Sequence, residues 1–139
     1  ESEIIDYDQK TGNRIKRTFS REGYGISRII EYNPETGNPI KDVGYWDYTD
    51  IPMYIVEYDS KTGNPIRETG YWACTDLPMY IIESDPTTGN TIKTIDYKRP
   101  FILDKIIKYD IKTGEIKSIH FGNFKYTPNT DQELESCIF

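Results

Sequence analysis

The sequence predicts an all-β protein, an antiparallel meander of about ten strands built from five β-hairpin repeats. A Thr-Gly pair recurs every 25 or 26 residues, with its glycines at Gly12, Gly37, Gly63, Gly89 and Gly114. Each pair follows two consecutive Ile or Val residues, which suit the surface of a pleated strand. A fixed period of this length is typical of repeat proteins, whose units bury apolar surface only against their neighbours. We therefore expect one long sheet, twisted or curled.

Each repeat consists of a predicted strand, a tight loop and a second strand. The loop begins with Asp or Asn and ends with Thr-Gly, and residues 33–37 and 85–89 also carry Pro in the second position. Proline sets the backbone angle of the first turn residue, and the Asx side chain accepts a hydrogen bond from a backbone N–H within the loop. Glycine supplies the left-handed residue that closes such a hairpin.

A second set of turns, at residues 22–25, 49–52, 75–78 and around 99–100, joins the hairpins. These turns divide the chain into units near residues 1–26, 27–52, 53–78, 79–104 and 105–121. In the fifth unit, one residue fewer separates Gly114 from the next isoleucine. A deletion turns the following side chains to the opposite face unless the turn absorbs it, so we expect a modified terminal unit.

Residues 122–139 break the pattern and form a predicted capping tail. Thr130 and Glu133 fit a capping box ahead of Leu134, which predicts a short helix or turn. An apolar tail can cover one edge of the sheet, where a bare strand would invite aggregation.

Charge and composition exclude several functions. The chain has 17 Lys and Arg against 23 Asp and Glu, a net charge of −6, and lacks the clustered basic residues that bind nucleic acid. No apolar run approaches the ~18 residues of a transmembrane helix, so we expect no membrane insertion. The first residue is Glu1 rather than Met, which suggests a processed or trimmed chain whose signal segment has been removed.

The inventory of catalytic and metal-binding residues is small. A hydrolase would require His120, the only histidine, to lie beside Cys74 or Cys137 in a cleft. The two cysteines permit one disulfide, and free thiols are an equal alternative. Zinc needs more His and Cys ligands, and calcium needs about six to eight oxygen ligands where each loop offers one Asp. We predict no enzyme activity, no metal and no cofactor.

The candidate partner-binding residues lie in two near-identical segments, residues 44–54 and 70–80. Trp, Tyr and Met are enriched at protein interfaces, and their concentration here predicts a binding patch. The alternative is that they form cross-strand aromatic pairs that stabilise a thin sheet. The patch would comprise Tyr45, Trp46, Tyr48, Met53, Tyr54, Tyr71, Trp72, Met79 and Tyr80.

The repeated module Ile-Ile-Glu-Tyr-Asx-x-x-Thr-Gly-Asn-x-Ile-Lys resembles the short tandem repeats of secreted phytoplasma proteins, a domain of unknown function, over residues 4–121. Ser84 departs from this pattern, since the other four units carry Tyr at its position. The resemblance implies a secreted bacterial virulence effector that acts in a plant host cell after removal of its signal peptide. It implies no catalytic residues.

We therefore expect a non-enzymatic scaffold that binds a host protein. The alternative is a carbohydrate-binding module, because regularly spaced Trp and Tyr can stack on sugar rings. Exposure of Trp46 and Trp72 would separate the two: solvent-facing indoles in polar grooves favour sugar, and a broad apolar patch favours protein. The sequence leaves the oligomeric state open.

Overall fold

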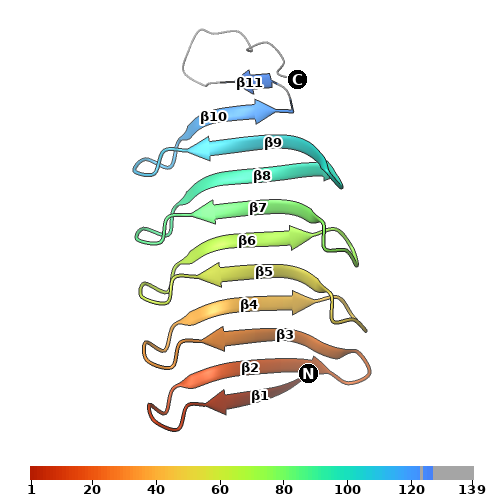
Figure 1. The fold of residues 1–139 in the computed structure, drawn as a ribbon, viewed down its shortest axis with the longest axis vertical. Helices are drawn as coiled ribbons and strands as arrows, with labels where there is room; N and C mark the ends of the chain where they lie inside the picture. Colours follow the sequence, from red (N-terminus) through yellow and green to blue (C-terminus); the bar gives the residue numbers. More distant parts are fainter. Residues whose placement is uncertain (123, 127–139) are drawn as a thin grey trace.

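The computed structural model describes residues 1–122 and 124–126 and shows one open antiparallel sheet of eleven strands (Figure 1). The strands pair in chain order, which confirms the predicted meander and adds one strand to the ten expected. They are β1 (Ser2–Tyr7), β2 (Arg14–Arg21), β3 (Gly25–Tyr32), β4 (Pro39–Tyr45), β5 (Pro52–Tyr58), β6 (Pro65–Tyr71), β7 (Pro78–Ser84), β8 (Thr91–Arg99), β9 (Ile102–Tyr109), β10 (Ile116–Phe121) and β11 (Phe124–Tyr126).

All five Thr-Gly loops close in the same way. The glycine N–H donates to the carbonyl oxygen of the Asx residue four positions earlier, at 2.7–2.9 Å. Every one of these glycines has a φ of 76° to 78°, the left-handed region that a β-carbon disfavours. In the loop between β7 and β8, Asp85 accepts hydrogen bonds from the Thr88 backbone N–H at 2.8 Å and from its hydroxyl at 2.9 Å. These bonds lower the pKa of Asp85.

The loop of the fifth unit has the same length as the other four. The one-residue deletion that the sequence suggested is therefore not present. The Asp110 N–H donates to the Glu115 carbonyl at 2.8 Å, as the Asp59 N–H donates to the Asn64 carbonyl at 2.9 Å in the third loop. Ile116 pairs with Tyr109 in the place where Pro65 pairs with Tyr58. The apolar residue has therefore moved one position along an unchanged hairpin.

Asparagine side chains tie each loop to the next. The Asn13 amide donates to the Pro34 carbonyl at 2.7 Å, and the Asn38 amide donates to the Ser60 carbonyl at 2.8 Å. These bonds join loops that are more than 20 residues apart in sequence, and they hold the loop edge of the sheet in register.

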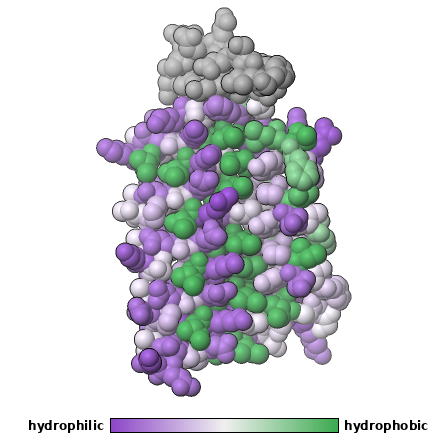
Figure 2. All heavy atoms as spheres, viewed as in Figure 1, coloured by the Kyte–Doolittle hydropathy of each residue, from purple (hydrophilic) through white to green (hydrophobic). Residues whose placement is uncertain are grey.

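One face of the sheet, here called the charged face, carries a ladder of alternating charge. Directly paired residues on successive strands have opposite signs from Asp6 on β1 to Lys93 on β8, a pairing that stabilises antiparallel sheets. The ladder comprises Asp6, Lys16, Glu31, Lys41, Glu57, Arg67, Glu83 and Lys93. Beside it runs an apolar row that includes Ile29, Val43, Ile55, Ile81 and Ile95. Figure 2 shows hydrophobic columns that run along the array beside hydrophilic ones.

The opposite face, here called the tyrosine face, places Tyr54 and Tyr80 over glycines of the neighbouring strands. A β-carbon on Gly44 would lie 2.2 Å from the Tyr54 ring, and one on Gly70 would lie 2.2 Å from the Tyr80 ring. The Tyr80 hydroxyl donates to Glu68 at 2.5 Å. Each tyrosine thus covers backbone that a glycine leaves bare.

A buried carboxylate lies on the same face. Asp42 is 4% exposed, and Arg28 donates to both of its oxygens, at 2.9 and 2.6 Å. Such a two-pronged pair compensates the desolvation of the charge.

Both faces contribute buried apolar residues, although the sheet is a single layer. Val43 and Ile81 are buried on the charged face, and Ile30 and Val56 are buried on the tyrosine face. Cross-strand neighbours on the same face exclude water here, in place of a second layer.

The first part of the tail extends the sheet, because β11 pairs with β10. The helix or turn predicted at Thr130, and the capping role of the remaining tail, lie outside the described residues. The described residues contain no helix of the length and apolar character that would cross a membrane.

Candidate functional site

The turn between β4 and β5 holds a tyrosine in a strained conformation. The Thr49 N–H donates to the Trp46 carbonyl at 3.1 Å, and the Thr49 hydroxyl donates to the same oxygen at 2.8 Å. Tyr48, the residue just before Thr49, has a φ of 62°. Glycine or asparagine is usual at such a position, and another L-residue costs roughly 1–2 kcal/mol there. Its exposed fraction is 73%, so the ring gains little from burial at this position.

The same turn recurs one repeat later, between β6 and β7. Thr75 donates to the Trp72 carbonyl through its N–H at 3.0 Å and through its hydroxyl at 2.8 Å. Cys74 takes the place of Tyr48, with a φ of 54°, and is exposed. The strain is therefore a property of the turn, whereas the side chain that it presents differs between repeats.

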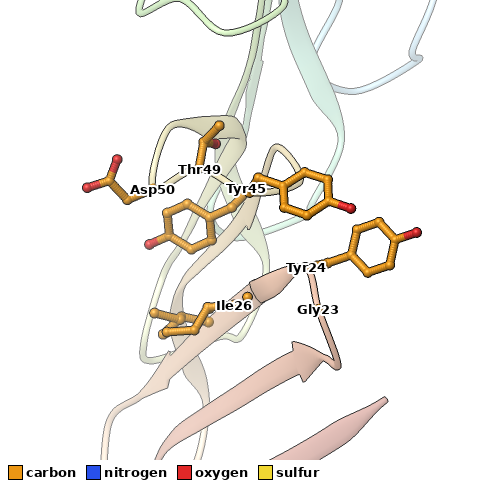
Figure 3. A pocket seen from close by; sticks show the side chains of 9 residues that line it. Gly23, Tyr24, Ile26, Tyr45, Thr49 and Asp50 are labelled. Atoms are coloured by element: carbon orange, nitrogen blue, oxygen red, sulfur yellow. The ribbon is translucent and has the colours of Figure 1, made fainter.

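Tyr48 lines an apolar pocket between the first two units. Figure 3 labels six of the other residues that line this pocket. The Tyr48 N–H donates to the Tyr24 carbonyl at 3.1 Å, and the centres of the two rings are 4.9 Å apart. The pocket, here called the turn pocket, has a volume of about 580 Å³. It is lined by Gly23, Tyr24, Gly25, Ile26, Ile29, Tyr45, Tyr48, Thr49 and Asp50.

The electrostatics of the turn pocket favour the neutral phenol of Tyr45, beside one exposed carboxylate. Burial raises the pKa of Tyr45, and the charges of Glu31 and Asp50 add to the effect. A neutral phenol can both pack against an apolar group and donate a hydrogen bond. Asp50 is exposed and can meet a positive charge on a ligand.

A smaller pocket of about 140 Å³ lies one repeat further along the sheet. It is lined by Pro52, Tyr71, Thr75 and Asp76. Each of these residues lies 26 positions after a residue of the turn pocket: Ile26, Tyr45, Thr49 and Asp50. The two pockets are therefore equivalent places in successive repeats.

The repeats have known relatives. A family model described as a protein of unknown function, DUF2963, matches residues 2–44, 19–70 and 53–96. The chain belongs to the DUF2963 family. This confirms that the hairpin array is a repeated domain of unknown function, and the residues of both pockets lie within the matched range.

Comparison with curated protein sequences finds no significant match. Among solved structures, a crystal structure of TarM is similar to 79% of this chain and 21% of that chain, with a TM-score of 0.47 and 9% identity. An S. aureus TarM mutant in complex with Fondaparinux, alpha-GlcNAc-glycerol and UDP is similar over 86% and 19%, with a TM-score of 0.44 and 8% identity. This DUF2963 chain spans about a fifth of those proteins, and the likeness supports no conclusion about function.

The structure distributes the predicted patch over several places. Tyr45 and Tyr48 line the turn pocket, and Tyr71 lines the smaller pocket. Tyr54 and Tyr80 lie on the tyrosine face, and Met53 lines a hollow there together with Gly44 and Tyr54. Met79 is at the corresponding position of the next repeat, 36% exposed.

The two tryptophans are partly buried. The indole nitrogens of Trp46 and Trp72 are inaccessible to solvent and have no hydrogen-bond partner among the described residues. Trp46 and Trp72 therefore pack with the indole N–H directed inward, where it is not available to a ligand.

Sequence reasoning did not identify Tyr24, Ile26, Ile29 or Asp50 as site residues. Tyr24 lies in the turn between β2 and β3, which is the same type of connection as the turn that carries Tyr48. Because β3 and β4 are adjacent in the sheet, these two turns lie side by side at the same end of the strands. The sequence could have revealed this contact, because in a meander every second turn lies at the same end of the strands.

The residues considered for catalysis lie apart. Cys74 lies in the turn before β7, and His120 lies on β10, three strands away, or roughly 14 Å at ~4.8 Å per strand. Cys137 lies outside the described residues. Within residues 1–122 and 124–126, no three His, Cys, Asp or Glu side chains gather as a metal site.

Proposed function

We propose that this protein is a secreted bacterial effector and that it acts as a non-enzymatic scaffold for a host plant protein, which docks at the turn pocket. The secretion and the plant host rest on the resemblance of the repeats to those of secreted phytoplasma proteins. The docking site rests on one observation, the strained and exposed Tyr48 at the edge of an apolar pocket.

Strain of this kind supports a role in binding. A left-handed non-glycine residue costs free energy, and such residues cluster at functional sites where the conformation is needed. In the turn pocket the strained backbone presents an aromatic ring to solvent beside Tyr24 and Tyr45. Tyrosines that stand at the rim of an apolar pocket are typical anchors of protein interfaces.

Burial of the tryptophans supports a protein partner over a carbohydrate. A sugar-binding platform would present indole rings to solvent and let the indole N–H donate to sugar hydroxyls. The indole nitrogens of Trp46 and Trp72 are buried. The exposed aromatic residue of the turn is Tyr48, beside an apolar hollow rather than a polar groove.

The test uses two matched substitutions. Tyr48→Gly removes the ring from the turn pocket and relieves the strain, and Cys74→Gly relieves the same strain one repeat later without touching that pocket. Each variant is used for affinity capture from plant extract, and its folding is checked by thermal unfolding. We expect both variants to remain folded, with Cys74→Gly recovering the wild-type partner and Tyr48→Gly losing it.

Two outcomes would overturn the proposal. One is recovery of the same partner by folded Tyr48→Gly and by wild type. The other is the absence of any plant protein retained by wild type above the level of an unrelated β-sheet protein.

A further inference from the structure

We propose that the segment which binds at the turn pocket is a proline-rich peptide in the polyproline II conformation that carries a basic residue. This inference rests on the proposed function and names the partner chemistry of the same site. Three observations carry it: the spacing of the two pockets, the hydrogen-bonding groups that line them and the carboxylate that each contains.

The spacing of the pockets matches the pitch of a polyproline II helix. Tyr45 and Tyr71 occupy equivalent positions two strands apart, which corresponds to roughly 9.6 Å at ~4.8 Å per strand. A polyproline II helix advances ~3.1 Å per residue with three residues per turn, so residues i and i+3 lie ~9.3 Å apart on the same side. One such ligand can therefore place two prolines in the two pockets.

Tyrosine and proline are paired on the strands that carry the two pockets. Tyr45 pairs with Pro52, and Tyr71 pairs with Pro78. Rows of aromatic and proline rings are typical of grooves that recognise proline-rich segments. The row lies where paired strands meet their turns, inside the array, so it offers no free strand edge to which an extended β-strand could be added.

The polar groups of the pockets also favour this conformation over an α-helix. The Tyr45 phenol is neutral near neutral pH, and its hydroxyl lines the turn pocket as a group that can donate a hydrogen bond. A polyproline II segment has no internal hydrogen bonds, and its carbonyls are free to accept. The carbonyls of a helix interior are already paired.

Each pocket contains one exposed carboxylate at the same position. Asp50 lines the turn pocket and Asp76 lines the smaller pocket. The chain as a whole has a net charge of −6. A Lys or Arg beside the prolines would meet Asp50 or Asp76, and electrostatic attraction would favour a basic ligand.

The direct test is a titration with synthetic peptides. The probe is a peptide of about twelve residues with proline at every third position and two arginines. The control peptide has the same composition with its prolines shuffled. Trp46 and Trp72 lie in the two turns, so their fluorescence reports binding at peptide concentrations up to about 1 mM.

We expect the periodic peptide to bind at least about tenfold more tightly than the shuffled peptide, a difference that reflects pocket spacing. The double substitution Asp50→Asn/Asp76→Asn should weaken binding roughly threefold to tenfold at low salt, and this effect should shrink as salt increases. Tyr7→Ala changes an exposed tyrosine beside the β1–β2 loop, at the opposite end of the strands from the turn pocket, and should leave binding unchanged.

Equal binding of the two peptides, or no binding of either, overturns the polyproline inference. If capture of a plant protein still depends on Tyr48 in that case, the proposed scaffold function stands and only the partner chemistry is wrong. If that capture fails as well, both proposals fall.

Discussion

Asn64 and Pro86 lie 22 residues apart in sequence, and the Asn64 side-chain amide donates to the Pro86 carbonyl oxygen at 3.0 Å. The same amide also approaches the Thr87 carbonyl, at 3.2 Å. Asparagine follows Thr-Gly in the first four loops, and Glu115 takes its place in the fifth. Residues 115–139 contain no further Thr-Gly pair. The asparagine therefore joins one repeat to the next, and in this loop the Thr62 hydroxyl donates to the same Pro86 carbonyl at 2.7 Å.

Asn64→Ala should destabilise the protein, because the Thr87 carbonyl loses its donor and the Pro86 carbonyl keeps only the Thr62 hydroxyl, at 2.7 Å. One hydrogen bond contributes roughly 0.5–1.5 kcal/mol, and these carbonyls are exposed enough for water to compensate in part, so we expect a loss near 1 kcal/mol. Urea denaturation of wild type and variant measures it.

Asn90→Ala is the matched control for this prediction. The Asn90 amide reaches the Ile111 carbonyl at 3.4 Å, a long and weak contact, so its loss should change the unfolding free energy by less than that of Asn64→Ala. Equal effects of the two substitutions would show that the amide hydrogen bonds do not decide loop stacking.

Gly44→Ala should destabilise the sheet, although alanine is normally the better strand residue by roughly 0.5–1 kcal/mol. The added β-carbon would lie 2.2 Å from the Tyr54 ring, which must move, and overpacking of this kind costs roughly 1–3 kcal/mol. In a Tyr54→Ala background the same substitution should become neutral or stabilising. A double-mutant cycle by thermal unfolding measures the reversal, and an unchanged sign in the two backgrounds would contradict the ring–glycine contact.

Tyr80 should make stability fall at high pH. Burial first, and then the hydrogen bond to Glu68, raise the pKa of Tyr80 to about 12, above the ordinary value of 10.0. A phenol whose pKa is raised on folding contributes stability below the unfolded value, and this contribution is lost as pH rises through the folded value. The window therefore extends from about pH 10 to about pH 12.

The difference in tyrosinate absorbance between wild type and Tyr80→Phe isolates this titration. Glu68→Gln removes the charge but keeps the side-chain size, so the midpoint should fall while burial keeps it above that of a free tyrosine. A midpoint at the ordinary value in wild type would contradict the contact between Tyr80 and Glu68.

Local chemistry made the hairpins predictable from sequence. Asp85, Thr88 and Gly89 form their loop through hydrogen bonds within five residues, so spacing alone reveals the turn. The same locality explains why chain order equals strand order: every connection is a short turn between neighbours. Thr-Gly periodicity therefore predicts the meander.

The turn pocket was less predictable, because it depends on relations between repeats. Tyr24 and Tyr48 belong to different turns, and their contact follows from the register of β3 and β4.

The alternation of side chains between the two faces of the sheet also fails at β-bulges. Met53 is an extra residue between the pairs Gly44–Tyr54 and Tyr45–Pro52, so it lies beside Tyr54 instead of on the opposite face.

Arg28→Met should leave the Asp42 carboxylate buried without its main partner. Asp42 stands between Ile30 and Val56 in its cross-strand row, so apolar neighbours cannot replace the two hydrogen bonds from Arg28. We expect a loss of roughly 1–3 kcal/mol, since the Arg28 side chain is 44% exposed and water can reach part of the site.

The second substitution, Asp42→Val, should recover most of this loss, because it removes the unpaired charge and adds an apolar residue to a row of isoleucine and valine. Chemical denaturation of the single and double variants measures both steps. A double variant that is no more stable than Arg28→Met would mean that the carboxylate is satisfied by other groups, and that the arginine stabilises this face through its stacking on Phe19, 5.7 Å from the ring centre.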